Sequence, residues 1–241
     1  MEIRDKILYA IVAFGIFYIV LTLFFSQLTL GELQMTKSFG LAGIYFFNAI
    51  IALFLGTTSF YKDVDRKVVY FLFSKPVTRA QFLLGKFFGL CLVLLVASAM
   101  LGLVYFGIVL YEHGGFDFVG LLAIFMQFLE MALFIAFAIF VSTFSSSLVS
   151  IVFTSAVFFI GHVVSALLTD AKAIGLGGIQ YRLVQLIYYV VPNLEKFDIR
   201  DLAIHSVPMP LASFGLALAY AAAYITLLLG GAIWIFDRKE I

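Results

Sequence analysis

Six runs of apolar residues, each long enough to cross a lipid bilayer as a helix, make up more than half of this 241-residue chain. A helix needs about 20 predominantly apolar residues to cross roughly 30 Å of hydrocarbon. Only helices and closed barrels satisfy their backbone hydrogen bonds there without water. We therefore expect an all-α integral membrane protein that forms a single transmembrane domain over residues 1–241. Its six transmembrane helices are predicted at residues 7–25, 39–60, 82–110, 119–141, 148–168 and 211–236.

The composition excludes a water-soluble domain. Hydrophobic residues make up 64% of the chain and charged residues only 12%, whereas soluble domains carry about 25% charged residues. The net charge of +1 comes without a basic arm, so no nucleic-acid partner is expected. The single cysteine, Cys91, rules out an internal disulfide and a cysteine-based metal cluster, and we predict no metal site.

Lysine and arginine are distributed unevenly between the segments that join the predicted helices. If the N-terminus lies in the cytoplasm, ten of the fifteen Lys and Arg residues fall in cytoplasmic segments and five fall outside. Cytoplasmic segments of membrane proteins carry an excess of these residues. We therefore expect both termini to be cytoplasmic.

The segment between the second and third predicted helices, residues 61–81, is the most charged part of the chain. It predicts a short amphipathic helix over about residues 63–73. Asp63 and Lys67 have the i, i+4 spacing of an acid–base pair on one face. Such a helix either rests on anionic lipid headgroups or docks on a partner protein. Its apolar face follows helical spacing and consists of Val64, Val68, Phe71 and Leu72.

A proline break and a new helix start follow this segment. Pro76 ends the amphipathic helix, because its ring clashes with a preceding carbonyl and it lacks an N–H. Thr78 and Gln81 have capping-box spacing, which predicts the start of the third transmembrane helix. Gly85 and Gly89 then permit the close approach of another helix, unless they are merely glycines tolerated near the interface.

Two stretches of this chain resemble one family of membrane proteins. Residues 60–79 and 82–89 read FYKDVDRKVVYFLFSKPVTR and FLLGKFFG, and they closely resemble the coupling-helix region of type-2 ABC exporter permeases. The likeness is to the NosY-like branch, which is often labelled as involved in copper-enzyme maturation. Residues 191–197, VPNLEKF, look like the external loop before the sixth helix in that branch. Asp63 stands where glutamate is common there, and Phe73 where leucine is common.

This resemblance implies the permease subunit of an ATP-driven ABC transporter in a bacterial or archaeal cytoplasmic membrane. The subunit would be non-catalytic and would pair with two ATPase subunits and a second permease subunit, as a homodimer or with a closely related chain. ATP and magnesium would bind to the ATPase, and no cofactor is expected here. The coupling helix would bind the ATPase through Asp63, Val64, Arg66, Lys67, Val68, Phe71, Leu72, Lys75, Pro76 and Arg79, and would carry its motion into the transmembrane helices.

The chain has no ATPase equipment of its own. The nearest match to a phosphate loop is the pair Gly85-Lys86. A phosphate loop requires Ser or Thr after the lysine, and Phe87 stands at that position.

Glu130 lies in the middle of the fourth predicted helix, where a charged group is costly and usually faces protein or water. Its functional interpretations are a proton site, a cargo contact or an anchor at a permease interface. The interpretation that we favour is a protonated carboxyl hydrogen-bonded to a neighbouring helix. His162, in the fifth predicted helix, is likewise expected to be a hydrogen-bonded packing residue. The alternative to an ABC permease is a proton-coupled secondary transporter with Glu130 as the coupling carboxylate.

The stretch between the fifth and sixth predicted helices, residues 169–210, is too polar in places to cross the bilayer twice. Residues 179–191 are largely apolar and contain tyrosines, which suit the headgroup level of the membrane. They predict an external helix that lies in the outer interface or dips into the membrane and returns. Re-entrant external helices at this place also agree with the family resemblance.

The predicted orientation is tested by cysteine labelling of intact cells. In a Cys91→Ala background, Arg66→Cys should be protected from a membrane-impermeant maleimide and Gly115→Cys should react, because the positively charged segments stay inside. Labelling of position 66 together with protection of position 115 would contradict the orientation.

Overall fold

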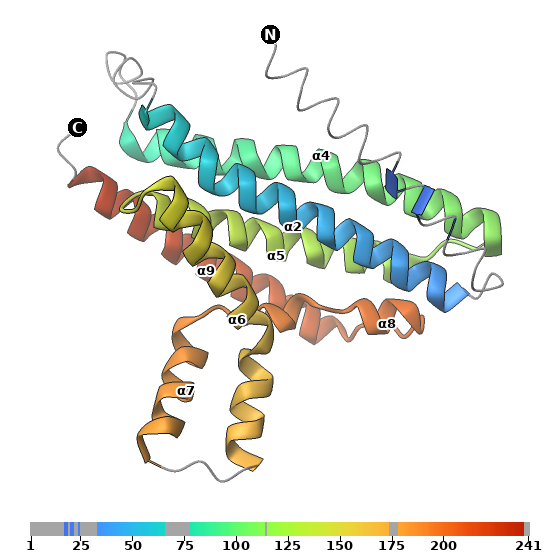
Figure 1. Ribbon diagram of the computed structural model, residues 1–241. Helices are drawn as coiled ribbons and strands as arrows, with labels where there is room; N and C mark the ends of the chain where they lie inside the picture. The colour runs from blue at the N-terminus through green and yellow to red at the C-terminus, as the bar shows by residue number, and fades with distance from the viewer. Residues whose placement is uncertain are drawn as a thin grey trace.

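The structure is a computed structural model. It describes residues 17, 18, 20, 21, 24, 33–65, 78–113, 115–173 and 178–238. All regular elements among these residues are helices (Figure 1): α2 (Leu33–Asp65), α4 (Arg79–His113), α5 (Phe118–Ser142), α6 (Ser147–Ala173), α7 (Gly178–Val190), the 3-10 helix η1 (Leu194–Phe197), α8 (Arg200–Ile204) and α9 (Leu211–Asp237).

Five of these helices, α2, α4, α5, α6 and α9, are long and apolar enough to cross a membrane. They coincide with the second to sixth predicted spans and are longer at most of their ends. An all-helical membrane fold is thus confirmed for the described part of the chain. Of the first predicted span, 7–25, only residues 17, 18, 20, 21 and 24 are described. The total of six spans and the cytoplasmic placement of the termini therefore stay predictions.

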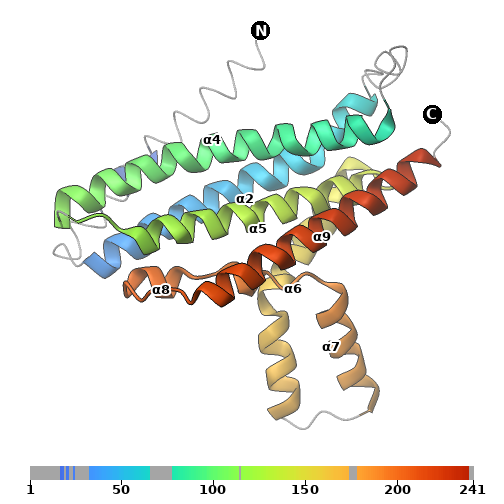
Figure 2. The same ribbon diagram turned by 180° about the vertical axis from the view of Figure 1, so that it is seen from behind.

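Helix α5 lies at the centre of the bundle, where it packs against α2, α4, α6 and α9 (Figures 1 and 2). In the most apolar stretch of 18 residues of α5, 72% of the residues are buried. In the corresponding stretch of each of the other four spans, 39% or fewer are buried. A helix that is buried on all sides is expected to be apolar on all sides. Accordingly, Glu130 is the only charged residue in α5.

The bundle has two ends, which we name after residues that lie there. The Arg79 end holds the end of α2, the start of α4, the turn between α5 and α6, and the end of α9. The Asp117 end holds the start of α2, the end of α4 and the start of α5. The sequence predicts that the Arg79 end faces the cytoplasm.

Small residues on α2 let neighbouring groups approach closely. A Cβ added at Gly56 would lie 2.8 Å from the Cβ of Ala138 on α5, and one added at Gly43 would lie 2.5 Å from the ring of Tyr18. Helices in membranes pack closely through such residues. Gly85 and Gly89 have no atom within 4 Å of an added Cβ, so no helix among the described residues approaches them closely.

Helices α6 and α7 form a hairpin that projects from the bundle. The second half of α6 turns away from the other spans and α7 returns beside it (Figures 1 and 2). Helix α7 corresponds to the external helix predicted over 179–191. Large apolar side chains are exposed on both arms, among them Phe159 and Ile179. This surface therefore faces lipid or another protein chain.

After α7 the chain returns to the bundle, and polar and steric contacts hold it there. A Cβ added at Gly161 of α6 would lie 2.7 Å from the carbonyl oxygen of Pro192, so the close crossing requires glycine. The backbone N–H of Asn193 donates to the hydroxyl of Tyr220 at 2.9 Å. The side-chain amide of Asn193 donates to the hydroxyl of Ser165 at 2.7 Å.

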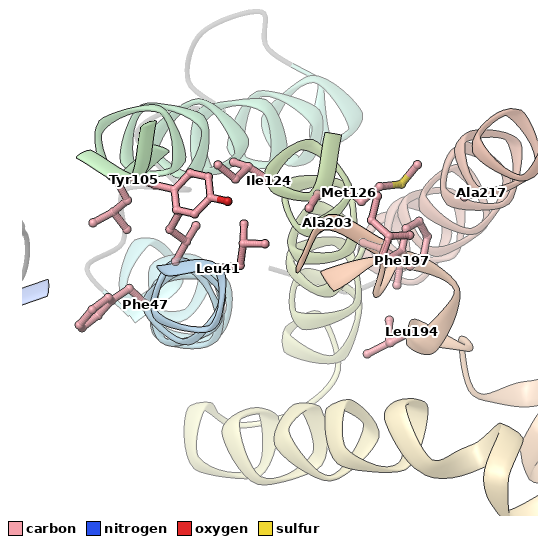
Figure 3. Packing of buried hydrophobic residues seen from close by; sticks show 14 of the residues in the cluster. Leu41, Phe47, Tyr105, Ile124, Met126, Leu194, Phe197, Ala203 and Ala217 are labelled. Atoms are coloured by element: carbon pink, nitrogen blue, oxygen red, sulfur yellow. The ribbon is translucent and has the colours of Figure 1, made fainter. Parts of the chain in front are cut away.

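The returning segment completes one part of the hydrophobic core. Leu194 and Phe197 of η1 and Ala203 of α8 are buried together with Met126 of α5 and Ala217 of α9 (Figure 3). The same cluster extends across α5 to Leu41 of α2, Tyr105 of α4 and Ile124 of α5. The segment between the fifth and sixth predicted spans is therefore packed against the spans rather than separate from them.

Lys37 corrects one prediction from the sequence. The predicted span of residues 39–60 leaves Lys37 outside the membrane helix, but α2 already begins at Leu33 and Lys37 is buried. The reason is pairing: its ammonium lies 3.0 Å from a carboxylate oxygen of Asp117. It also donates to the hydroxyl of Ser206 at 2.9 Å. A lysine that is paired in this way can continue a buried helix.

Asp117 has further partners besides Lys37. The hydroxyl of Tyr105 donates to Asp117 at 2.8 Å, and the backbone N–H of Gly120 donates to it at 3.1 Å. Asp117 is thus the N-cap residue of α5. The ion pair therefore fastens α2, α4, α5 and the turn after α8 at the Asp117 end.

Removing one member of this ion pair should destabilise the protein more than removing both. Lys37→Met leaves the Asp117 carboxylate buried without its cation, and such a change typically costs about 3–5 kcal/mol. Asp117→Asn leaves the lysine charge uncompensated, although Asn still caps α5. Adding Asp117→Asn to Lys37→Met should recover part of the loss. The measurement is thermal unfolding of the purified full chain in detergent, and strictly additive losses would contradict this interpretation.

Candidate functional site

Three polar side chains from three different spans meet inside the bundle, about halfway along α5. The hydroxyl of Tyr45 on α2 lies 2.7 Å from Oε1 of Glu130 on α5. The same hydroxyl lies 2.5 Å from Nε2 of His162 on α6. Nε2 of His162 lies 3.0 Å from Oε1 of Glu130. We call these residues the Tyr45–Glu130–His162 cluster.

Glu130 is the most deeply buried member of the cluster. Its side chain is 0% exposed, and its second carboxylate oxygen, Oε2, has no hydrogen-bond partner among the described residues. Burying a charged group without partners is costly, so such groups at bilayer depth are usually paired. In the cluster, the partners of Glu130 are the phenol and the imidazole.

His162 is oriented by its own helix. Its Nδ1 lies 2.8 Å from the backbone carbonyl oxygen of Phe158, one turn earlier in α6. A carbonyl oxygen only accepts hydrogen bonds, so we assign a proton to Nδ1. Nε2 is then the nitrogen that faces Tyr45 and Glu130. Such a second hydrogen bond is how proteins fix the tautomer of a functional histidine.

Arg200 and Asp198 lie against the Tyr45 side of the cluster. The guanidinium carbon of Arg200 is 4.7 Å from the centroid of the Tyr45 ring, which is a cation–π distance. Nε of Arg200 donates to Asp198 at 2.8 Å, and a second N–H of Arg200 donates to the other carboxylate oxygen. Burial would raise the pKa of the Asp198 carboxyl, but its hydrogen bonds and ion pair with Arg200 lower that pKa overall. Asp198 is therefore ionised at neutral pH.

The predicted coupling region is described in part. Helix α2 continues without a break to Asp65, so Asp63 and Val64 lie in its last turn rather than in a separate short helix. The other predicted partner-binding residues of this region, apart from Arg79, lie outside the described residues: Arg66, Lys67, Val68, Phe71, Leu72, Lys75 and Pro76.

The start of α4 is as the sequence predicts. The backbone N–H of Thr78 donates to the side chain of Gln81 at 3.0 Å, and the backbone N–H of Gln81 donates to the hydroxyl of Thr78 at 3.2 Å. These reciprocal bonds confirm the capping box. The first residue of α4 is Arg79.

Arg79 links α4 to the end of α9. Its guanidinium donates to the backbone carbonyl oxygens of Phe236 at 2.6 Å and Asp237 at 3.2 Å. Positive groups bind well at helix C-termini, where carbonyl oxygens lack partners. The rings of Phe82 and Phe236 stack beside this contact, with centroids 6.3 Å apart. The two helices are therefore joined firmly at the Arg79 end.

Residues 3–241 match the family model for ABC-2 family transporter proteins. The chain belongs to the ABC-2 transporter family. It is therefore a multi-pass membrane protein and a permease component of an ABC transporter, a class that is non-catalytic and works with an ABC ATPase. No curated protein matches the chain significantly.

Sequence reasoning singled out two members of the cluster in this ABC-2 permease but not their meeting. Glu130 and His162 stood out as ionisable residues in the middle of predicted spans, and the structure brings them together. Tyr45 gave no signal, because a tyrosine within an apolar run is ordinary. A buried carboxylate needs a partner at the same depth. This requirement alone indicated that Glu130 pairs with a residue of another span.

Tyr45→Phe tests how much the cluster stabilises the permease. The variant removes the hydroxyl that contacts Glu130 and His162 but keeps the ring beside Arg200. Leaving buried polar groups with fewer partners costs about 1–3 kcal/mol, so the unfolding midpoint of the purified chain should fall by several degrees. Tyr111→Phe is the matched control, since Tyr111 is 91% exposed. A Tyr45→Phe variant as stable as this control would contradict a stabilising role.

Proposed function

We propose that this ABC-2 permease spans the membrane as half of a transport pathway and receives motion from a separate ATPase through residues 63–79. Membership of the family carries the proposal, and the structure of the Arg79 end supports it. In the sequence, residues 66–77 stand between two long helices, α2 and α4. Arg79 then fastens the start of α4 to the end of α9. A push on this segment would therefore reach three spans.

The proposed assembly contains two permease subunits and two ATPase subunits. ATP and magnesium bind to the ATPase chains, and this chain contributes a single transmembrane domain without a cofactor. Exposed apolar side chains on α6, such as Val152 and Phe159, provide surface for lipid or for the second permease. We place the complex in a bacterial or archaeal cytoplasmic membrane, with the Arg79 end inside, and in the NosY-like branch.

A proton-coupled secondary transporter is the weaker proposal. It rests on Glu130, which has hydrogen-bond partners within the chain. A carboxyl with partners of this kind stabilises the bundle whether or not it moves protons. Permeases of this family work with ATPases, so ATP hydrolysis can supply the energy for transport. The ATP-driven proposal therefore does not need proton coupling at Glu130.

The docking proposal is tested by the double variant Val68→Asp, Leu72→Asp. These residues lie on the apolar face of the amphipathic helix predicted from the sequence. Burying one side chain of this size is worth roughly 1.5–3 kcal/mol, and each 1.4 kcal/mol changes affinity about tenfold. The variant should still insert into the membrane. Its affinity for the ATPase should fall by two orders of magnitude or more, so that the ATPase no longer copurifies with it.

A matched control separates docking from a general effect of two new charges. Val207 and Leu211 are exposed apolar residues in the turn before α9 and at its start, away from the Arg79 end. Val207→Asp, Leu211→Asp should therefore retain the ATPase. If the Val68→Asp, Leu72→Asp variant is inserted and binds the ATPase at full stoichiometry, the predicted helix is not the docking element.

A further inference from the structure

The three facing atoms of the Tyr45–Glu130–His162 cluster form a triangle, with edges of 2.5, 2.7 and 3.0 Å. These are hydrogen-bond distances, so the three atoms are held together only by the protons that lie between them. The Nδ1 proton of His162 is used on the carbonyl oxygen of Phe158. The hydroxyl of Tyr45 brings one proton, which can occupy one edge at a time.

The single proton of Tyr45 cannot satisfy all three contacts of the triangle. With Glu130 ionised and Nε2 of His162 unprotonated, lone pairs of Oε1 and Nε2 would oppose each other at 3.0 Å. One more proton, on either atom, turns this contact into a hydrogen bond, and the two protons then serve three edges because one of them is shared between two acceptors. It also leaves the cluster without net charge, which suits a carboxyl that is fully buried. The geometry thus requires one proton shared by Glu130 and His162.

The same triangle is too small for a metal ion. Bonds from zinc to nitrogen and oxygen are about 2.0–2.2 Å long, so tetrahedral ligand atoms lie about 3.3 Å apart or more. The longest edge here is 3.0 Å. Among the described residues, moreover, no group of three His, Cys, Asp or Glu side chains could hold a metal. A proton is the ligand that fits.

We propose that Glu130 and His162 form a binding site for one exchangeable proton, and that loss of this proton opens the junction between α2, α5 and α6. Without the proton, lone pairs are left opposed inside the bundle. The side chains must then separate or admit water. Because each member of the cluster belongs to a different span, separation changes how these spans pack.

Titratable and charged groups face the cluster from two spans and from the segment at the start of α8. Tyr45 faces Glu130 from α2 and His162 faces it from α6. Asp198 and Arg200 act on it electrostatically from the segment at the start of α8, and their opposite charges are paired with each other. Helices α4 and α9 have no Asp, Glu, Lys, Arg or His at residues 87–111 and 211–236. The shared proton is therefore controlled by these few groups.

The same groups are the partly exposed members around the cluster. The side chain of His162 is 23% exposed, whereas that of Glu130 is 0% exposed. The side chains of Arg200 and Asp198 are 29% and 28% exposed, and Arg200 covers the ring of Tyr45. The partly exposed side of the cluster is therefore the side that carries His162 and the Asp198–Arg200 pair. In the predicted topology this pair belongs to the external segment.

This inference goes beyond the proposed coupling to an ATPase, because it concerns the chain's own buried side chains. Its test therefore uses the full-length permease alone, in lipid nanodiscs. The nitrogen-15 resonances of labelled histidine report directly which ring nitrogen carries a proton. His113→Gln and His205→Gln remove the other two histidines, so that every signal comes from His162.

The expected result is a titration of one proton between pH 4 and pH 10. The Nε2 resonance should move while Nδ1 stays protonated, because the carbonyl of Phe158 holds that proton. Glu130→Gln should shift the midpoint by at least one pH unit, since it removes the carboxylate that shares the proton. Glu195→Gln, at an exposed residue, is the control and should leave the midpoint unchanged. If neither the Nε2 resonance nor the carboxyl carbon-13 resonance that Glu130→Gln removes titrates, or if Glu130→Gln leaves the midpoint unaffected, the proton site is overturned.

Opening of the junction is measured separately, as a distance between α2 and α6. Spin labels at Phe46→Cys and Phe159→Cys, both exposed positions, are introduced in a Cys91→Ala background and diluted with unlabelled chain. The distance distribution should broaden or lengthen as the His162 proton is lost, and Glu130→Gln should shift this change with the titration. An unchanged distribution across the titration overturns the proposed opening.

Discussion

Polar groups buried inside the bundle must find their partners within the protein, because neither water nor hydrocarbon satisfies them there. In this permease such partners join helices that are distant in the sequence. Lys37 binds Asp117 at the Asp117 end, and Asn48 of α2 donates to Ser98 of α4 at 2.9 Å. Apolar contacts between membrane helices tolerate sliding and rotation far better than these directional contacts do. These buried polar pairs therefore fix how far α2 is shifted along α4 and α5.

Helices α2 and α5 are joined at two depths. Lys37 and Asp117 form the first junction, and Tyr45 and Glu130 form the second. The segment between α7 and α9 touches both, because Arg200 lies over Tyr45 and the turn after α8 accepts a hydrogen bond from Lys37. A shift of this segment would therefore disturb both junctions. Conversely, a change at either junction acts on the segment that the sequence places outside.

The spans were predictable from the sequence because an uninterrupted apolar run of sufficient length has few alternatives to a membrane helix. Lys37 was misjudged because hydropathy counts a charge without its partner, and Asp117 is remote in the sequence. Glu130 and His162 were recognisable as rare ionisable residues within spans. Their contact with Tyr45 was not, since it depends on how α2, α5 and α6 rotate about their axes, which apolar sequences do not specify.

Helix α2 carries residues of both the proposed coupling region and the proposed proton site. Its 33 residues run without a break from the Asp117 end to Asp65, a length of about 50 Å at 1.5 Å per residue. A displacement of α2 by a docked ATPase would move Tyr45 relative to Glu130 and His162. Because a hydrogen bond weakens within a few tenths of an ångström, that displacement would change how tightly the cluster holds its proton. By thermodynamic reciprocity, the protonation of the cluster would change the cost of displacing α2 by the same free energy.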